Sequence, residues 1–206
     1  LSGERRLGRP FAAGAGNQLG PRNPVDDAPT FDLSPDGRWI GVTQAEAAVV
    51  VRGAESLAVR ATLDAVEDGA VLDVGFSPDG SVLAAGGVGG QVTLWDTRTW
   101  RRIRGPLRGP GSGLPKGARE SVRTIAFSPD GATLAAGTEA VSITDPNAPP
   151  DLDGRVFLWD VQTGSPEGHA IGAEGPSLDV AFSPDGSMLA GAYNAFDFDA
   201  KPETKK

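Results

Sequence analysis

Short apolar runs separated by turn residues make up the hydrophobic pattern of this chain. One clear unit holds four such runs, at residues 71–76, 82–86, 91–95 and 100–107. The first two runs are separated by Ser-Pro-Asp-Gly, in which Pro presets φ, Asp suits the third turn position and Gly accepts a left-handed conformation. Turn signals every 8–12 residues are typical of all-β proteins. The unit therefore predicts four short antiparallel strands.

The same unit recurs along the chain. Ser-Pro-Asp-Gly begins at Ser34, Ser77, Ser128 and Ser183, and Leu-Trp-Asp closes the third run at residues 94–96 and 158–160. Such a period is the signature of a repeat protein, in which neighbouring repeats bury each other's faces. The second runs are rich in Ala and Gly, as in 84–86 and 135–137. We expect these small residues to lie where neighbouring sheets converge and leave little room.

The combination of Phe-Ser-Pro-Asp-Gly turns with Leu-Trp-Asp closures resembles the WD40 repeat family, over residues 29–193. The resemblance implies an all-β fold, a WD40-type β-propeller of about three and a half blades. The expected divisions are an outer strand of a preceding blade at 1–11, a loop at 12–28, blade 1 at 29–63, blade 2 at 71–107, blade 3 at 122–171, half of blade 4 at 177–193 and a polar tail at 194–206.

Propellers of this family usually close with about seven blades, so we expect a fragment of a larger ring. The alternative is a small closed ring in which residues 7–11 join the last blade. As an open array, the chain would expose strand edges and blade faces, and we expect it to self-associate.

Blades of the family are often fixed by a hydrogen-bonded chain that begins at a Gly-His pair and ends at the Trp. Here no Gly-His pair stands at that place in a repeat, because the one histidine, His169, falls in a fourth strand. Gly89 stands where an Asp would precede the third strand, and Arg52 stands near the Trp position of the first repeat. We therefore expect apolar packing to hold these blades more than a polar network does.

Composition narrows the classes of partner. The chain has no cysteine and a net charge of −8, so neither a disulfide framework nor non-specific nucleic-acid binding is expected. It has no apolar run of the roughly 18 residues that a membrane span needs. The lack of cysteine favours a reducing compartment, and we expect the cytoplasm.

Residues that could act in catalysis or bind a metal ion are better explained by structural roles. Asp36, Asp79, Asp130 and Asp185 each lie in a hairpin turn of a different repeat, which favours turn chemistry over a shared metal or acid–base site. The one histidine, His169, has no nucleophile motif or carboxylate partner beside it. We expect no catalytic residue, no metal, no cofactor and no enzymatic activity.

Two segments are longer and more highly charged than a turn between strands requires. Residues 98–123 hold eight basic residues against one acid, and residues 139–153 form an acidic insertion between two strands. Loops that outgrow their repeat commonly carry binding residues. We expect the two loops, at 108–121 and 139–154, to open on one face and to place the candidate partner-binding residues side by side: Arg108, Lys116, Arg119, Asp145, Asp151 and Asp153.

The leading hypothesis for function is a protein–protein interaction scaffold or sensor module of a larger signalling protein, with a protein as its partner. The Thr163-Gly164 turn style resembles bacterial WD40 arrays attached to signalling NTPases and kinases. The alternative is a propeller-type enzyme or enzyme-associated domain of the lactonase, peptidase or quinoprotein type. A truncated product without activity of its own is a third alternative.

Overall fold

Strands make up all the regular structure that the computed structural model describes. The described residues are 29–44, 47–67, 69–109, 118–142, 154–168, 170–172 and 177–193. These ranges contain no helix, and hence no helix that could cross a membrane. The segments expected to be an outer strand (1–11), a loop (12–28) and a polar tail (194–206) lie outside the described residues.

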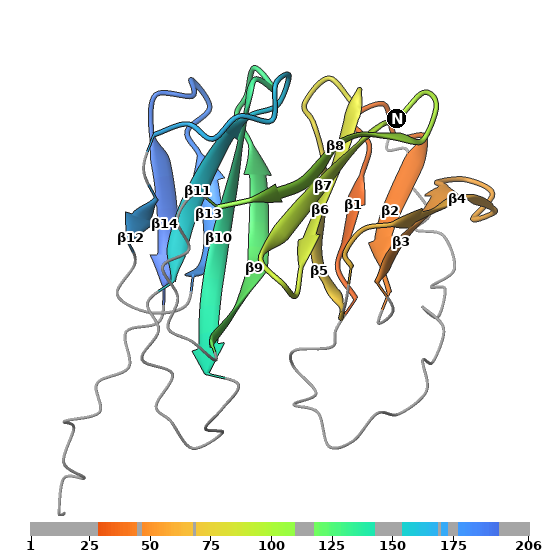
Figure 1. The fold of residues 1–206 in the computed structure, drawn as a ribbon. Helices are drawn as coiled ribbons and strands as arrows, with labels where there is room; N and C mark the ends of the chain where they lie inside the picture. Colours follow the sequence, from red (N-terminus) through yellow and green to blue (C-terminus); the bar gives the residue numbers. More distant parts are fainter. Residues whose placement is uncertain are drawn as a thin grey trace, which may run out of the picture.

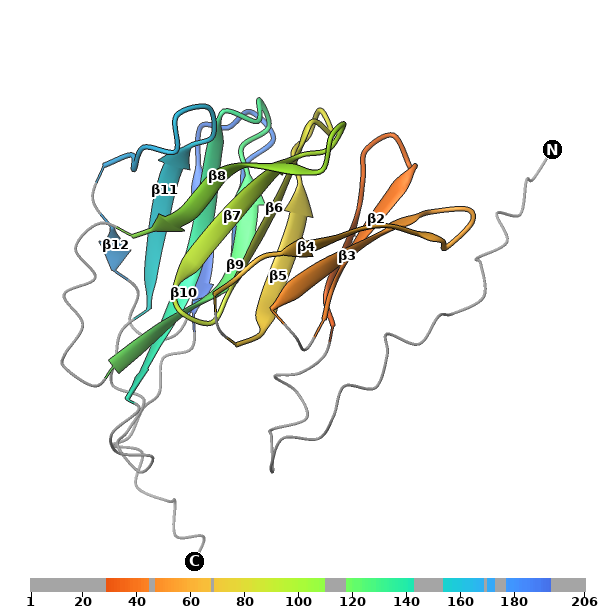
Figure 2. The same ribbon diagram turned by 45° about the vertical axis from the view of Figure 1, so that its right-hand side comes forward.

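The strands form four separate antiparallel sheets that stand side by side (Figures 1 and 2). The first sheet contains β1 (Phe31–Leu33), β2 (Trp39–Thr43), β3 (Ala48–Gly53) and β4 (Val59–Asp64). The second contains β5 (Val71–Phe76), β6 (Val82–Gly87), β7 (Gln91–Asp96) and β8 (Arg101–Arg108). The third contains β9 (Ala118–Phe127), β10 (Thr133–Ser142), β11 (Arg155–Asp160) and β12 (Ile171–Gly172). The fourth contains β13 (Ser177–Phe182) and β14 (Leu189–Tyr193).

Strand order follows chain order within every sheet, as expected for propeller blades. Three buried apolar clusters fill the spaces between the sheets: one between the first and second, one between the second and third, and a smaller one between the third and fourth. The expected all-β fold and partial propeller are therefore confirmed, with sheets of four, four, four and two strands.

Each Ser-Pro-Asp-Gly turn closes on itself by the same hydrogen bonds. In the second sheet, the Ser77 hydroxyl donates to Asp79 Oδ1 at 2.6 Å and accepts from the Val82 backbone N–H at 2.9 Å. Gly80 takes a positive φ of 72°, the conformation that favours glycine. Asp36, Asp130 and Asp185 accept equivalent bonds from the serine of their own turns. The expectation that these aspartates serve turn chemistry is confirmed.

Polar side chains on the innermost strands tie each sheet to the next. Asp32 Oδ2 of β1 accepts the Phe76 backbone N–H of β5 at 2.7 Å, and Asp73 Oδ2 of β5 accepts the Ile125 N–H of β9 at 2.8 Å. The Thr124 hydroxyl of β9 lies 3.3 Å from Asp179 Oδ1 of β13. These inter-sheet bonds fix the relative height of neighbouring inner strands. Asp73, Thr124 and Asp179 each stand four residues before the serine of the next turn, a spacing that was not recognised from the sequence.

The second strands leave no room for side chains larger than those present. Ala84, Ala85, Ala135 and Ala136 are fully buried, which confirms the expectation of a narrow space between sheets. A Cβ atom built on Gly86 would lie 2.9 Å from Cβ of Val122 on the neighbouring sheet, closer than real Cβ contacts occur.

The outer part of the first interface is wider and is filled by two large rings. Trp39 of β2 and Trp100, in the turn before β8, meet edge to face with ring centroids 5.6 Å apart. Trp100 is buried although its φ of 57° lies in the left-handed region, which disfavours a bulky side chain. Neighbouring sheets are thus close near the centre and separated toward the periphery.

Gly86→Ala should destabilise the protein by about 1–3 kcal/mol, because the new methyl group overpacks the contact with Val122. Gly191→Ala is the matched control, since its Cβ would meet its nearest atom at 3.9 Å. We expect that variant to lose no stability and to gain up to about 1 kcal/mol. Urea denaturation of both variants measures the difference, and equal effects would contradict the narrow contact.

Asp73→Asn should change how stability depends on pH. Burial, helped by the carboxylates of Asp179 and Asp32, raises the pKa of Asp73 to about 6. The folded protein then holds the proton more tightly than the unfolded chain, so this contribution to stability is complete below about pH 4 and is lost as pH rises through 6. Asparagine does not ionise and keeps an acceptor oxygen for Ile125. The variant should therefore exceed the native protein in stability at pH 7, by about 2 kcal/mol, and match it near pH 4.

Asp79→Asn is the control, because its effect on stability should depend on pH in the opposite direction. Hydrogen bonds from Ser77 and Ser81 lower the pKa of Asp79, so its contribution is present above the unfolded pKa and is lost as pH falls. This variant should be less stable than the native protein at pH 7 and converge with it in acid. Urea denaturation at pH 4 and pH 7 tests Asp73→Asn, and a further measurement below about pH 3 tests the convergence of Asp79→Asn. An Asp73→Asn effect independent of pH would refute the assignment.

Candidate protein-binding face

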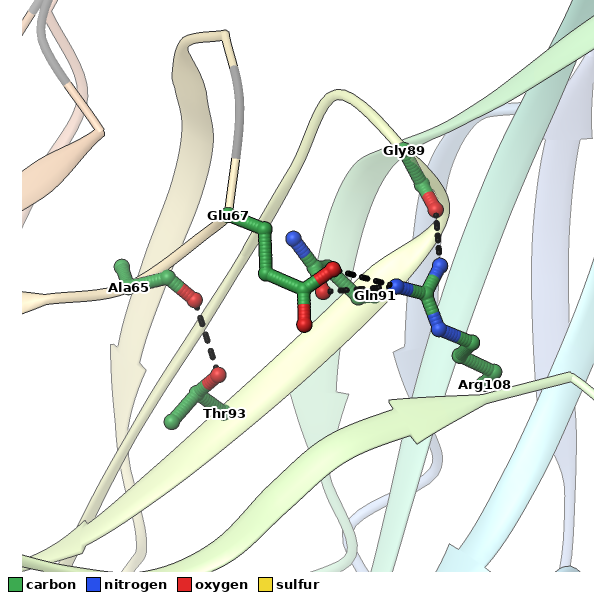
Figure 3. A network of polar contacts seen from close by, with 6 residues as sticks. All are labelled: Ala65, Glu67, Gly89, Gln91, Thr93 and Arg108. Carbon is green, nitrogen blue, oxygen red and sulfur yellow. Dashed lines mark hydrogen bonds and ion pairs between the residues drawn. The ribbon is translucent and has the colours of Figure 1, made fainter.

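Connections from the first three sheets gather at one end of the molecule, the lower end in Figure 1, which we call the loop end. It contains the β4–β5 connection, the β6–β7 turn, the start of β9 at Ala118 and the end of β10 at Ser142. Val88 of the β6–β7 turn forms an isolated bridge with Ser121 of β9. The Thr93 hydroxyl donates to the Ala65 carbonyl at 2.8 Å, which joins the first sheet to the second (Figure 3).

Arg108, the last residue of β8, is the centre of a polar network at the loop end (Figure 3). Its Nη2 atom lies 2.9 Å from Glu67 Oε2 and 3.2 Å from Gln91 Oε1, and its Nη1 donates to the Gly89 carbonyl at 2.9 Å. Gln91 is buried, whereas the side chains of Arg108 and Glu67 are 52% and 67% exposed. The guanidinium is thus held in one orientation while much of its surface stays open to solvent.

A second polar cluster is built on β9 and β10. Buried Glu120 accepts a hydrogen bond from the Thr138 hydroxyl at 2.9 Å, and its backbone carbonyl accepts the Gly89 N–H at 3.0 Å. Burial raises the pKa of Glu120, while the bond from Thr138 and the charge of Arg155 act in the opposite direction. The third sheet therefore has a partial polar network in addition to the apolar packing that the sequence led us to expect as the main contribution.

The two charged loops leave the third sheet together. β9 and β10 are ten residues long and pair along most of their length, with Arg119 opposite Val141 and Ser121 opposite Glu139. The strands therefore run into both expected loops, 108–121 and 139–154, so those limits were too wide. The sequence hid this pairing because a register shift at Gly137/Thr138 interrupts the alternation of side chains. Arg123 and Glu139 on these strands form an ion pair at 2.8 Å.

Only part of the expected binding site falls within the described residues. Arg108 is described in full, and its contacts are with Glu67, Gly89 and Gln91. Arg119 is described as a backbone position of β9. The other four candidates lie outside the described residues: Lys116, Asp145, Asp151 and Asp153. Their proximity to Arg108 and Arg119 stays a prediction.

Residues that could have suggested catalysis are occupied elsewhere or not described. The turn aspartates have lowered pKa values because serine hydroxyls and backbone N–H groups bind their carboxylates, and Asp185 reaches about 2. The described ranges contain no group of three His, Asp or Glu residues that could hold a metal ion. His169 lies outside them.

Three residues of the loop end were missed from the sequence. Glu67 and Glu120 are isolated acids whose partners lie on other strands, so no local pattern marks them. Gln91 gave a weak signal, because it follows the Gly89-Gly90 turn at the first position of an apolar strand. A polar residue at a buried strand position usually has a hydrogen-bond partner, here Arg108.

Comparison with known proteins agrees with this architecture. The family model described as WD domain, G-beta repeat matches residues 59–96 and 113–160. The WD repeat-containing protein VIP3 of Arabidopsis thaliana is 32% identical over 115 residues, which cover 53% of this chain and 32% of that protein. The WD repeat-containing protein SL1-17 of Schistosoma mansoni is 33% identical over 122 residues, which cover 58% of this chain and 32% of that protein.

The match thus spans about a third of the length of these relatives. Each matched segment of the family model ends at Asp96 or Asp160, the closing residue of a third strand. With its strands ordered as consecutive four-stranded sheets and its Leu-Trp-Asp closures at these positions, the chain contains WD40 repeats at residues 59–96 and 113–160.

Proposed function

We propose that this chain is a protein–protein interaction scaffold or sensor module of a larger signalling protein, and that it binds a protein partner through the loop end. The observation that supports this most directly is the clustering of connections from three sheets at that end. A rigid β frame that presents several adjacent loops suits recognition of a sizeable partner.

The charges at the loop end support binding more than stability. The Arg108–Glu67 pair is largely exposed, and such pairs contribute only about 0–1 kcal/mol each. Charges of both signs at an exposed face instead steer and orient a charged partner. The proposed contact residues remain Arg108, Lys116, Arg119, Asp145, Asp151 and Asp153, to which we add Glu67.

A non-enzymatic role is the second part of the proposal. Both relatives are named for their WD repeats, and the turn aspartates are bound within their own turns. Stoichiometric metal in the purified intact protein would instead favour the lactonase or quinoprotein alternative. The net charge of −8 argues against nucleic acid as the partner, and the absence of cysteine favours the cytoplasm.

Reversal of charge at the loop end should abolish partner capture without unfolding the protein. We expect Arg108→Glu/Arg119→Glu to stay folded but to melt at a lower temperature, since Arg108 also donates to buried Gln91 and to the Gly89 carbonyl. Proteins captured from extracts of the native cells and identified by mass spectrometry should be lost from this variant. The binding that remains in the native protein should weaken as salt is raised.

Arg98→Glu is the matched control for that experiment. Arg98 is exposed in the turn between β7 and β8, at the end opposite the loop end (Figure 1). It carries the same change of charge, and capture should persist. Equal loss in both variants would show a general effect of net charge, and retention in both would remove the loop end as the binding face.

We also propose that the open ends of the array self-associate. Among the described strands, β14 pairs with β13 alone, so its other edge is free of strand partners there. At the opposite end of the array, Phe31 and Leu33 of β1 are 71% and 50% exposed. Asp32 between them points to β5, so these two apolar side chains face away from the second sheet.

Phe31→Lys/Leu33→Lys should reduce self-association of the 206-residue chain in light scattering at micromolar concentration. Charged side chains on an exposed strand oppose sheet-to-sheet contact. Ile171→Lys, which changes an apolar residue of 51% exposure on β12, is the control and should leave association unchanged. A native chain that stays monomeric across the concentration range would contradict this proposal.

A further inference from the structure

A groove of about 470 Å³ opens between the second and third sheets, at the end opposite the loop end. Its walls come from the start of β6, from the outer strand β8, from the β9–β10 turn and from the turn that follows β11. The lining residues include Val82, Ile103, Arg104, Ala132 and Asp160. The volume is within the range of ligand pockets.

The equivalent space between the first and second sheets is filled. Strand register equates Trp39 with Val82, because Ile40 pairs with Arg52 as Leu83 pairs with Trp95. Trp100 and Gly164 are likewise equivalent, since each donates its N–H to the carbonyl of the residue four positions earlier. The edge-to-face tryptophan pair of the first interface is thus replaced by valine and glycine in the second.

A third pair of equivalent positions has the small residue in the first interface and the large residue in the second. Ala61 pairs with Val51 of β3 as Arg104 pairs with Leu94 of β7, so alanine and arginine occupy equivalent positions. A packed apolar set of Trp39, Trp100 and Ala61 has therefore become an open groove with a guanidinium in its wall. The groove is therefore a difference between two equivalent interfaces of the same chain. Side chains fill this space in the first interface and leave it open in the second.

A β-bulge aims the arginine into this space. The pairing of β8 with β7 shifts between Leu94 and Trp95, so adjacent residues Ile103 and Arg104 both line the groove. The Arg104 guanidinium donates to two backbone carbonyls, those of Ile103 and Gln162. Its Nε atom is buried and has no hydrogen-bond partner, and no carboxylate of the described residues forms an ion pair with it.

We propose that this groove binds an extended acidic segment of a partner protein, with a carboxylate on Arg104 and a neighbouring apolar side chain against Ile103 and Val82. A carboxylate is the strongest acceptor for a guanidinium, and it reaches the buried Nε when the Arg104 side chain turns toward the groove. The surroundings match this charge, because Arg101 is exposed at the start of the same strand. This inference rests on the proposed role in protein binding, at a second face of the molecule.

Asp160 is the one acidic residue in the groove wall, and it limits where a carboxylate can bind. Its Oδ1 accepts from the Thr163 hydroxyl at 2.7 Å and from the Thr163 backbone N–H at 2.6 Å. These bonds lower its pKa, so Asp160 stays ionised at neutral pH. The incoming carboxylate is therefore confined to the Arg104 side of the groove, and Asp160→Asn should strengthen its binding.

The test uses two peptides with fluorescein on the N-terminal amine, Gly-Leu-Glu-Leu-Gly-amide and the same peptide with Gln in place of Glu, titrated by fluorescence anisotropy against the full 206-residue chain. We expect the Glu peptide to bind at least about tenfold more tightly than the Gln peptide. Arg104→Lys should remove about that difference, because lysine keeps the charge but lacks the Nε–H and the planar fork. A benzophenone placed on the peptide at one Leu should cross-link to residues of the groove.

A variant that copies the closed interface tests the space itself. Val82→Trp/Arg104→Ala/Gly164→Trp should fill the groove, keep the β-sheet circular dichroism spectrum and lose the cross-link. If this variant does not fold, the peptide affinities of Arg104→Lys and Asp160→Asn still test whether the groove binds a carboxylate. Acetate at a hundredfold excess over the peptide should not compete, because the apolar contact belongs to the peptide.

Several results would overturn the groove as an acidic-peptide site: equal affinity for both peptides, cross-links outside the groove, full competition by acetate, or no saturable binding. If peptide binding fails while Arg108→Glu/Arg119→Glu still abolishes partner capture, the groove proposal alone falls. If both fail, the role in protein binding falls with it.

Discussion

Neighbouring sheets converge toward one side, and this geometric constraint governs the rest of the structure. Near the centre the sheets approach so closely that the second strands carry Ala84 and Gly86, and carboxylates such as Asp73 reach across to the backbone of the next sheet. Toward the periphery the same divergence leaves a space that must be filled by large side chains or remain open. The chain does both: Trp39 and Trp100 close one interface, and Val82 lines a groove at the next one.

Local chemistry made most of this fold predictable. Ser-Pro-Asp-Gly marks each first turn, and the structure shows the Ser77–Asp79 bond and the left-handed Gly80 that this sequence requires. Leu-Trp-Asp marks the end of the third strand in the second and third sheets, and the Ala-Gly second strands indicate the narrow side of the interface. These features depend on residues within a few positions of one another, so a single sequence displays them.

Features that join distant strands could not be predicted in the same way. The bond from Asp32 to Phe76 spans two sheets, and Glu120 meets Thr138 only after β9 and β10 pair through an irregular register. The basic residue Arg108 was singled out by the charge of its segment, but its contacts with Glu67 and Gln91 follow from the meeting of three connections. The distribution of charge along the chain thus indicated the segment that contains the site, whereas the topology of the sheets determines which side chains are in contact.

The perpendicular tryptophan pair has an optical consequence. Two indoles with centroids 5.6 Å apart and planes at 86° lie close enough for their electronic transitions to couple, and a coupled pair held in one chiral arrangement gives a paired positive and negative band in far-ultraviolet circular dichroism. Trp39 belongs to the first sheet and Trp100 to the second, so this band exists only while the two sheets are docked. The chain therefore contains a built-in spectroscopic marker for one interface, separate from the signal of the strands themselves.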